Sequence, residues 1–171
     1  MIVRDFLDWV RTAPAGKRAE ATSALARAYL YSDLSPDDLD AAEGAMLMQL
    51  DDPSPLVRRA LADALAASPS APPAIVLALA SDQPDIAAPV LALSPLFVDA
   101  DLVDAVATGT PAIQAAIASR AALPRSVAAA IAEVGTAESW LALLHNHDAD
   151  IAPFSIASSS ATAISRPYAS R

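Results

Sequence analysis

The stretch Asp52-Pro53-Ser54-Pro55-Leu56-Val57-Arg58-Arg59-Ala60-Leu61-Ala62 decides the fold. A proline before an apolar row at helical spacing predicts that a helix begins near Leu56. Helices of this first type are also predicted near residues 86, 113 and 140, at intervals of 30, 27 and 27 residues. A second type is centred on Ile75–Leu79, Leu102–Val106 and Val127–Ile131. Short helix pairs that recur at a fixed period indicate an α-solenoid, whose hairpins bury their apolar faces by stacking.

Composition supports an all-α class, although an irregular helical bundle with accidental spacing is the alternative to a solenoid. The apolar fraction is 54%, mostly alanine and leucine, and the chain has 14 prolines but only 4 glycines. Such a chain favours short helices that prolines start or stop. The absence of cysteine excludes disulfides and thiolate metal sites. A net charge of −9 disfavours nucleic acid and anionic membranes as partners.

The part before the period predicts three helices, at Ile2 to Arg11, Lys17 to Tyr31 and Pro36 to Leu50. Ser35 is the predicted N-cap of the third helix. In the second helix we expect an inner face of Ala21, Leu25 and Ala28 and an outer face of Arg18, Glu20 and Arg27. We therefore predict a single repeat domain over residues 1–153, with N-terminal helices (1–50) and periodic hairpins (51–153). A serine-rich tail (154–171) follows it. Carboxylates near the N-terminus argue against a signal peptide, so we expect a cytoplasmic protein.

Two sets of motifs resemble known repeat proteins. Asp52 before a helix, with the Val57-Arg58 pair in its first turn, resembles the hallmark of HEAT repeats. The elements Pro89-Val90-Leu91 and Ile117-Ala118-Ser119-Arg120 are similar to a bacterial family, the domain of unknown function numbered 2336. The likeness covers about Ile2 to Pro153 and implies a HEAT-like fold without an established activity. Because members usually continue with more helices, this is either a short member or one whose C-terminal part is missing.

The HEAT-like reading predicts the structural role of several residues. In HEAT stacks the arginine of the Val-Arg pair reaches a neighbouring turn, so we expect Arg58 to bind Asp52 or Asp82. Arg59, about 100° further round the helix, should face solvent. The alternative is a small anion site made by both arginines. Pro89 should lie inside a helix and kink it, because apolar spacing continues beyond it.

Two residues near helix ends are predicted to be structural. Arg120 should neutralise carbonyls at a helix end, although it could instead face a ligand. Asn146, in the sequence His145-Asn146-His147-Asp148, should take the left-handed cap position after a helix. We expect His145 and His147 to interact with the negative helix end and to bind no metal.

No cluster in the sequence has the spacing of a catalytic, cofactor or metal site. Asp99, Asp101 and Asp104 suit the start of a helix better than a calcium loop, because no glycine stands at mid-loop. A nucleophile elbow and a phosphate-binding glycine loop are both missing from the sequence. We therefore predict a protein that is not an enzyme and that has no cofactor.

The favoured function is a scaffold that binds a protein or peptide partner in a groove lined by the second helices. The candidate groove residues are Asp101, Asp104, Arg125, Ser126 and Glu133. A HEAT-like nucleic-acid-binding or DNA-repair protein is the runner-up, although both tryptophans are predicted on buried faces where no base could stack. The third alternative is an N-terminal support of a larger regulatory protein.

Overall fold

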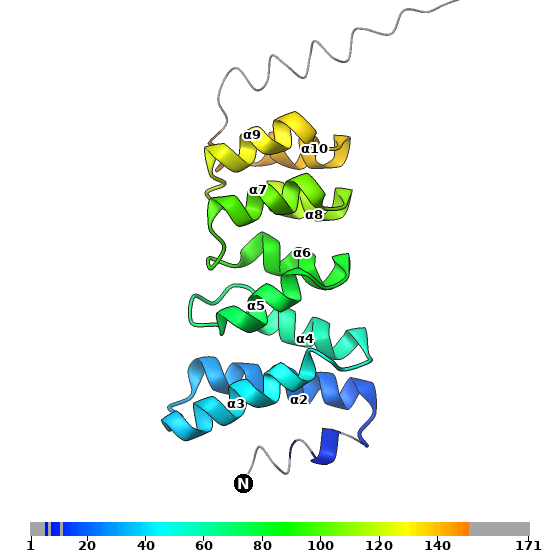
Figure 1. Cartoon of the computed structure of the whole chain (residues 1–171), viewed down its shortest axis with the longest axis vertical. Coiled ribbons are helices and arrows are strands. Elements are labelled where there is room, and N and C mark those ends of the chain that lie inside the picture. The colour runs from blue at the N-terminus through cyan, green and yellow to red at the C-terminus, as the bar shows by residue number, and fades with distance from the viewer. Residues whose placement is uncertain (1–5, 7, 11, 151–171) are drawn as a thin grey trace, which may run out of the picture. The chain divides into compact units, whose positions relative to one another are not determined.

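The structure, a computed structural model, describes residues 6, 8–10 and 12–150 and forms two compact units, Met1–Phe97 and Val98–Arg171. Unit 1 contains α2 (Ala15–Tyr31), α3 (Pro36–Gln49), α4 (Pro55–Leu65), α5 (Pro73–Ala80) and α6 (Pro84–Leu93). Unit 2 contains α7 (Asp99–Thr108), α8 (Pro111–Ala118), α9 (Arg125–Val134) and α10 (Ala137–His145). Helices are the only regular elements in this described part, so the all-α prediction is confirmed (Figure 1).

Each predicted helix centre from residue 56 onward falls inside a helix of the structure. The first helices are α4, α6, α8 and α10, and the second helices are α5, α7 and α9. We extend these names to α2, a first helix, and α3, a second helix. Prolines open α3, α4, α5, α6 and α8, where a missing backbone N–H costs nothing. Ser35 caps α3 as predicted, by accepting a hydrogen bond from the backbone N–H of Asp38.

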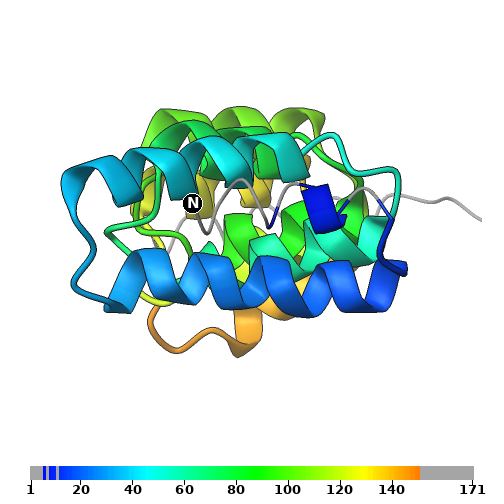
Figure 2. The same cartoon turned by 90° about the horizontal axis from the view of Figure 1, so that it is seen from below.

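In unit 1 the helices lie in two layers (Figures 1 and 2). The first helices pack in series, α2 on α4 and α4 on α6, while α3 and α5 form the other layer. The core is aliphatic; among its fully buried side chains are Met46, Val57, Leu61, Leu65, Ile75, Leu79 and Ile86. A single hairpin could not exclude water from so many side chains, so the stacking of hairpins builds this core.

Unit 2 repeats the arrangement with shorter helices. Helix α8 packs on α10, and α7 packs on α9. Its core is made chiefly of Leu102, Val106, Ile117, Leu123, Val127, Ile131 and Leu143. Four of these side chains, Leu102, Val106, Val127 and Ile131, belong to the predicted centres of second helices, which supports the predicted register.

The inner face of α2 differs from the prediction. Thr22 and Ala26 are its buried residues, whereas Ala21, Leu25 and Ala28 are only half-buried. Arg18 stands four residues before Thr22 and therefore shares the face that packs on α4. The predicted outward position of Arg18 is wrong, because the alanine-rich helix has apolar residues on most sides and its pattern cannot fix one face.

Two further predictions concern the ends of the described region. Trp9 is 43% exposed, so its predicted burial is wrong, while Trp140 is half-buried. Ile2 and most of the first predicted helix lie outside the described residues, as does the tail over residues 154–171. Pro89 lies inside α6, as predicted.

Candidate functional site

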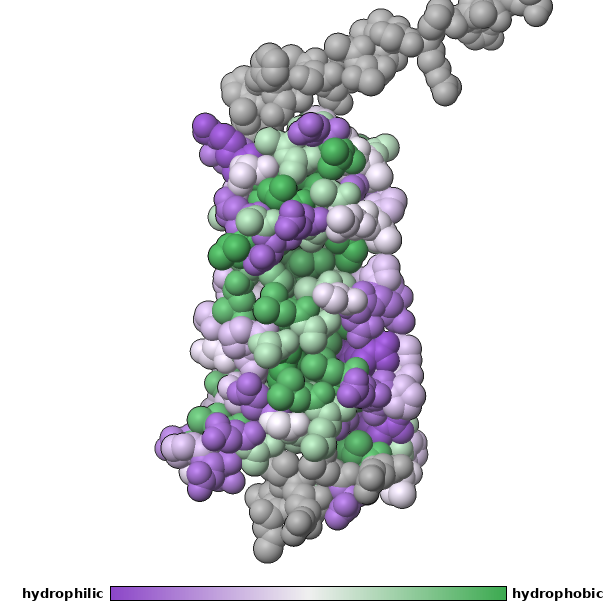
Figure 3. All heavy atoms as spheres, in the orientation of Figure 1, coloured by the Kyte–Doolittle hydropathy of each residue, from purple (hydrophilic) through white to green (hydrophobic). Residues whose placement is uncertain are grey.

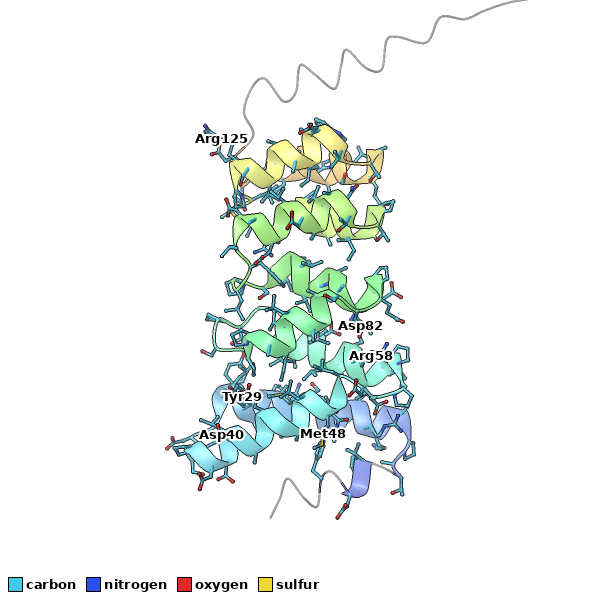
Figure 4. The ribbon with its side chains drawn as sticks, viewed as in Figure 1. Tyr29, Asp40, Met48, Arg58, Asp82 and Arg125 are labelled. Atoms are coloured by element: carbon cyan, nitrogen blue, oxygen red, sulfur yellow. The ribbon has the colours of Figure 1, made fainter. Side chains whose placement is uncertain are left out.

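Arg58 links two turns of unit 1. Its Nε and Nη2 donate to the two carboxylate oxygens of Asp82, at 2.6 and 3.2 Å, and Nη1 donates to the backbone carbonyl of Asp52 at 2.7 Å. The planar guanidinium thus forms a bidentate pair with the carboxylate of one turn and a third hydrogen bond with the backbone of the other. Figure 4 shows Arg58 and Asp82 next to each other at one edge of the unit. Asp52 and Asp82 are the two partners predicted for Arg58 from the sequence, and the structure shows contacts with both.

Arg18 makes the same arrangement one hairpin earlier. Its Nε and Nη2 donate to the carboxylate of Asp52, both at 2.8 Å, and its Nη1 donates to the carbonyl of Ala13 at 2.8 Å. Arg18 and Arg58 are both the fourth residue of a first helix. Each therefore binds a carbonyl before its own helix and an aspartate before the next first helix. Asp52 carries two links, through its carboxylate to Arg18 and through its carbonyl to Arg58.

The two aspartates of this network are held ionised. Burial opposes ionisation of Asp52, but hydrogen bonds from Arg18 and from the backbone N–H of Ser54 lower its pKa overall. For Asp82 the hydrogen bond from Arg58 is the main cause of a lowered pKa, against a smaller effect of burial. The side chains of Arg58 and Asp82 are each 17% exposed, so water screens this pair less than a surface pair.

Arg59 also connects two hairpins. Its Nε donates to Asp63 at 2.8 Å, and its Nη1 donates to the backbone carbonyl of Asp85 in α6 at 2.7 Å. The side chain is exposed, as predicted, yet it bridges α4 and α6. Both guanidinium groups of the Arg58-Arg59 pair thus have carboxylate and carbonyl acceptors, which leaves little support for a small anion site.

Unit 2 has a neutral counterpart of Arg58. Gln114 is the fourth residue of α8 and is buried. Its Nε2 donates to the carbonyl of Val106 at 2.9 Å, and its Oε1 accepts from the backbone N–H of Thr136 at 3.0 Å. Like Arg58, Gln114 binds a carbonyl before its own helix and the turn before the next first helix. Sequence reasoning missed Gln114 because it is not part of a Val-Arg pair; its place four residues into a proline-started helix was the available signal.

Asn146 does not take the predicted left-handed conformation. Its φ is −85° and its ψ is 98°, which is extended backbone. Among the described non-glycine residues, Ala122 has a positive φ and Asn146 does not. The Asn146 side chain instead donates to the carbonyls of Ala118 and Arg120, at 2.8 and 2.7 Å. These acceptors lie at the end of α8, so Asn146 ties the end of α10 to the end of the preceding first helix.

Arg120 occupies the turn after α8. Its backbone N–H donates to Ile117, and burial of its half-buried side chain lowers the pKa of the guanidinium. Arg120 therefore lies at a helix end, and its predicted effect on the carbonyls there stays a prediction.

The predicted groove residues are all exposed and come from α7 and α9, which pack together. Arg125 forms a fork on Asp150 at 3.1 and 3.0 Å, and the Ser126 hydroxyl donates to Asp99 at 2.7 Å. Asp101 accepts from the backbone N–H of Val98 at the start of α7. Asp104 and Glu133 lie further along their helices.

One histidine of the sequence His145-Asn146-His147-Asp148 contacts the end of α10. His145 Nδ1 lies 2.8 Å from the carbonyl of Leu141 in the last turn of α10, and the backbone N–H of Asp148 donates to Asn146. Across the described residues, no group of three or more histidine and carboxylate side chains is placed to hold a metal ion. The described helices also include none with the length and apolar content needed to cross a membrane.

Helices α7 to α10, with Gln114 and Asn146, lie in a segment of the chain that matches a family model. Residues 86–165 match the model of a family described as an uncharacterised protein conserved in bacteria, DUF2336. The match extends over 80 of the 171 residues. The family is the one that the sequence motifs indicated, and the DUF2336 segment includes all of α7, α8, α9 and α10. No curated protein and no solved structure matches the chain.

Proposed function

We propose that the chain is a HEAT-like α-solenoid that serves as a scaffold and binds a protein or peptide partner on the exposed side of its second helices. The observation that carries the proposal is the placement of the links between hairpins. Arg18, Arg58 and Gln114, each at the fourth position of a first helix, reach the turn before the next first helix. A link that recurs at the same helix position, twice in unit 1 and once in unit 2, supports a stacked repeat.

The links leave the outer side of the second helices available. The guanidinium groups of Arg18, Arg58 and Arg59 donate hydrogen bonds to turns and to first helices. Exposed residues of α5, α7 and α9 include Ala74, Leu77, Asp104, Ala129 and Glu133. Within each unit, this side offers a partner helix or an extended peptide ordinary helix-in-groove contacts.

Photo-cross-linking in cells that produce the protein tests this proposal. A photoreactive residue replaces Ala74, on the exposed side of α5, or Leu56, which is equally accessible on the first helix α4. We expect one defined cross-linked protein from position 74 and none from position 56. The captured protein, identified by mass spectrometry and purified, should then bind the unmodified chain. Cross-links of the same yield at both positions, or none at position 74, would contradict the proposal.

A further inference from the structure

Helix α5 presents an uncharged, apolar side to solvent. Its sequence Pro73-Ala74-Ile75-Val76-Leu77-Ala78-Leu79-Ala80 contains no polar side chain. Ile75, Val76 and Leu79 are buried, and Pro73, Ala74, Leu77 and Ala78 are exposed on the other side. Leu77 is 53% exposed, and Figure 3 shows a hydrophobic area over this part of unit 1. A short helix that is apolar on every side is normally covered on every side, so the exposed side fits a contact surface.

Exposed carboxylates lie in the same layer of unit 1, on α3. Asp37, Asp38 and Asp40 are exposed at the N-terminal end of this helix, where Figure 3 shows a hydrophilic area. Glu43 is set apart from them, because it accepts a hydrogen bond from Tyr29 of α2. Asp38 accepts from the Ser35 hydroxyl within its own cap.

The described cations of unit 1 leave these three carboxylates uncompensated. Lys17, Arg18, Arg58 and Arg59 pair with carboxylates outside α3. Arg27, exposed on α2, forms no ion pair with a described carboxylate. Figure 4 shows Asp40 at the end of α3 that is remote from the pair of Arg58 and Asp82. Within the described part of the chain, the ion pairs of unit 1 therefore include no carboxylate of α3.

Lysine and arginine are absent from both second helices of unit 1. Helix α7 of unit 2 also contains neither. Helix α9 has one, Arg125, which is bound to Asp150. In unit 1 the lysine and arginine residues of the described helices lie on α2 and α4, and α6 has none. The second helices of unit 1 thus combine apolar residues with carboxylates, and they are complementary to a partner that combines apolar residues with cations.

We propose that the face of unit 1 formed by α3 and α5 binds a basic amphipathic helix of a protein partner. The apolar side of that helix covers Ala74, Leu77 and Ala78, and its lysines or arginines lie beside Asp37 and Asp40. An acidic partner would meet like charges there, and a nucleic acid would be repelled by the same carboxylates. This inference rests on the scaffold function proposed above and adds the chemical class of the partner.

Three synthetic helices of about 18 residues test the charge preference, since a helix of this length spans about 27 Å and exceeds the length of α3. All three have the same leucine and alanine side, and the other side carries lysine, glutamine or glutamate. Fluorescence anisotropy with the full chain should show the tightest binding for the lysine helix, weaker binding for the glutamine helix and none for the glutamate helix. Raising salt from about 50 to 300 mM should weaken only the lysine helix, because screening reduces the attraction between charges.

Matched variants locate the site. Leu77→Gln should weaken the lysine helix by roughly tenfold, the loss expected when one apolar anchor becomes polar. Leu141→Gln on α10, 58% exposed in the native chain, is its control and should change nothing. Asp37→Asn with Asp38→Asn and Asp40→Asn should weaken binding by roughly threefold to tenfold and should reduce its salt dependence. Asp51→Asn with Glu138→Gln and Asp148→Asn makes the same change of charge elsewhere and should leave binding intact.

The outcomes separate this inference from the scaffold function. Equal binding of all three helices, or equal losses in site and control variants, would overturn the inference. If a cellular partner cross-links at position 74 and the glutamate helix binds best, the scaffold function stands and the basic partner is wrong. If position 74 captures nothing and no helix binds, both are wrong. Far-UV circular dichroism of each variant shows whether a loss of binding reflects loss of the fold.

Discussion

Arg59 donates a 2.7 Å hydrogen bond to the backbone carbonyl of Asp85, four residues before Pro89. In a helix that carbonyl would normally accept from the N–H of the residue at position 89, which proline lacks. Arg59 therefore supplies from α4 the donor that Pro89 removes from α6. The interior proline predicted from the sequence and the second arginine of the Val-Arg-Arg stretch are parts of one contact.

This relationship predicts a coupling between Arg59 and Pro89. Arg59→Ala should lower the free energy of unfolding by about 1 kcal/mol, the usual net value of one hydrogen bond. In a Pro89→Ala background the new N–H can reach Asp85, so removal of Arg59 should cost clearly less. Urea denaturation of the two single variants and the double variant measures the coupling. Additive losses would show that the carbonyl of Asp85 does not depend on Arg59.

Arg58 should matter more than Arg59. Arg58→Ala strands a partly buried carboxylate on Asp82 and removes the donor to the Asp52 carbonyl, at an expected cost of about 1–3 kcal/mol. Arg58→Lys should recover only part of it, because an ammonium group cannot form the planar fork. Urea denaturation midpoints at neutral pH compare these variants with Arg59→Ala. A larger loss at Arg59 would contradict the ranking and with it the role of the Val-Arg pair in the repeat.

Acid should weaken unit 1 through Asp52 and Asp82. Both have a folded-state pKa below the unfolded value of about 3.9. Their stabilisation is therefore complete above the unfolded pKa and is lost as the pH falls through the lowered folded-state pKa. The difference in urea midpoint between the native chain and an Asp52→Asn, Asp82→Asn variant should be largest near pH 7 and should shrink toward pH 2. A difference that is independent of pH would mean that Arg18 and Arg58 do not lower the pKa values of the two carboxylates.

The sequence predicted helix positions better than helix faces. Prolines at helix starts and the spacing of apolar residues are local signals, so α4 to α10 were found in the right order. The inner face of α2 was missed because Arg18 is held by Asp52, 34 residues later, and an alanine-rich helix has no distinct polar side. The cap predicted for Asn146 was wrong for a similar reason. Its side chain has acceptors on Ala118 and Arg120, 28 and 26 residues away, which local rules cannot locate.

Gln114 should stabilise unit 2 in the way that Arg58 stabilises unit 1. Gln114→Ala leaves the carbonyl of Val106 and the N–H of Thr136 without this partner, at a cost of about 1–3 kcal/mol. Gln114→Glu keeps an acceptor for Thr136 but sets a carboxylate against the Val106 carbonyl. Burial and that carbonyl should raise its pKa, so the variant should gain stability relative to Gln114→Ala as acid protonates the glutamate. Urea denaturation of both variants at pH 7 and pH 4 makes the comparison, and a gap that stays constant would contradict it.

Two glycines of the chain should respond to alanine in opposite directions. Gly135 ends α9 at a φ of −69°, which any residue can adopt, so space and not conformation explains this glycine. An added Cβ there would meet the carbonyl of Ile131 and would lie 2.7 Å from the Ser139 hydroxyl, which helps to cap α10. Gly44, inside α3, has nothing within 4 Å of an added Cβ. Gly44→Ala should therefore stabilise the chain by about 0.5–1 kcal/mol, through the lower backbone entropy of the unfolded state.

Gly135→Ala should destabilise the chain by about 1–3 kcal/mol, because the last turn of α9 and the first turn of α10 must separate to admit a methyl group. Gly109→Ala, at the equivalent turn before α8, should behave in the same way, since its Cβ would meet the Ala105 carbonyl and the Ile113 side chain. Thermal unfolding followed by circular dichroism compares the three variants. Equal shifts of the thermal unfolding midpoint by Gly135→Ala and Gly44→Ala would contradict the close approach of α9 and α10 at this turn.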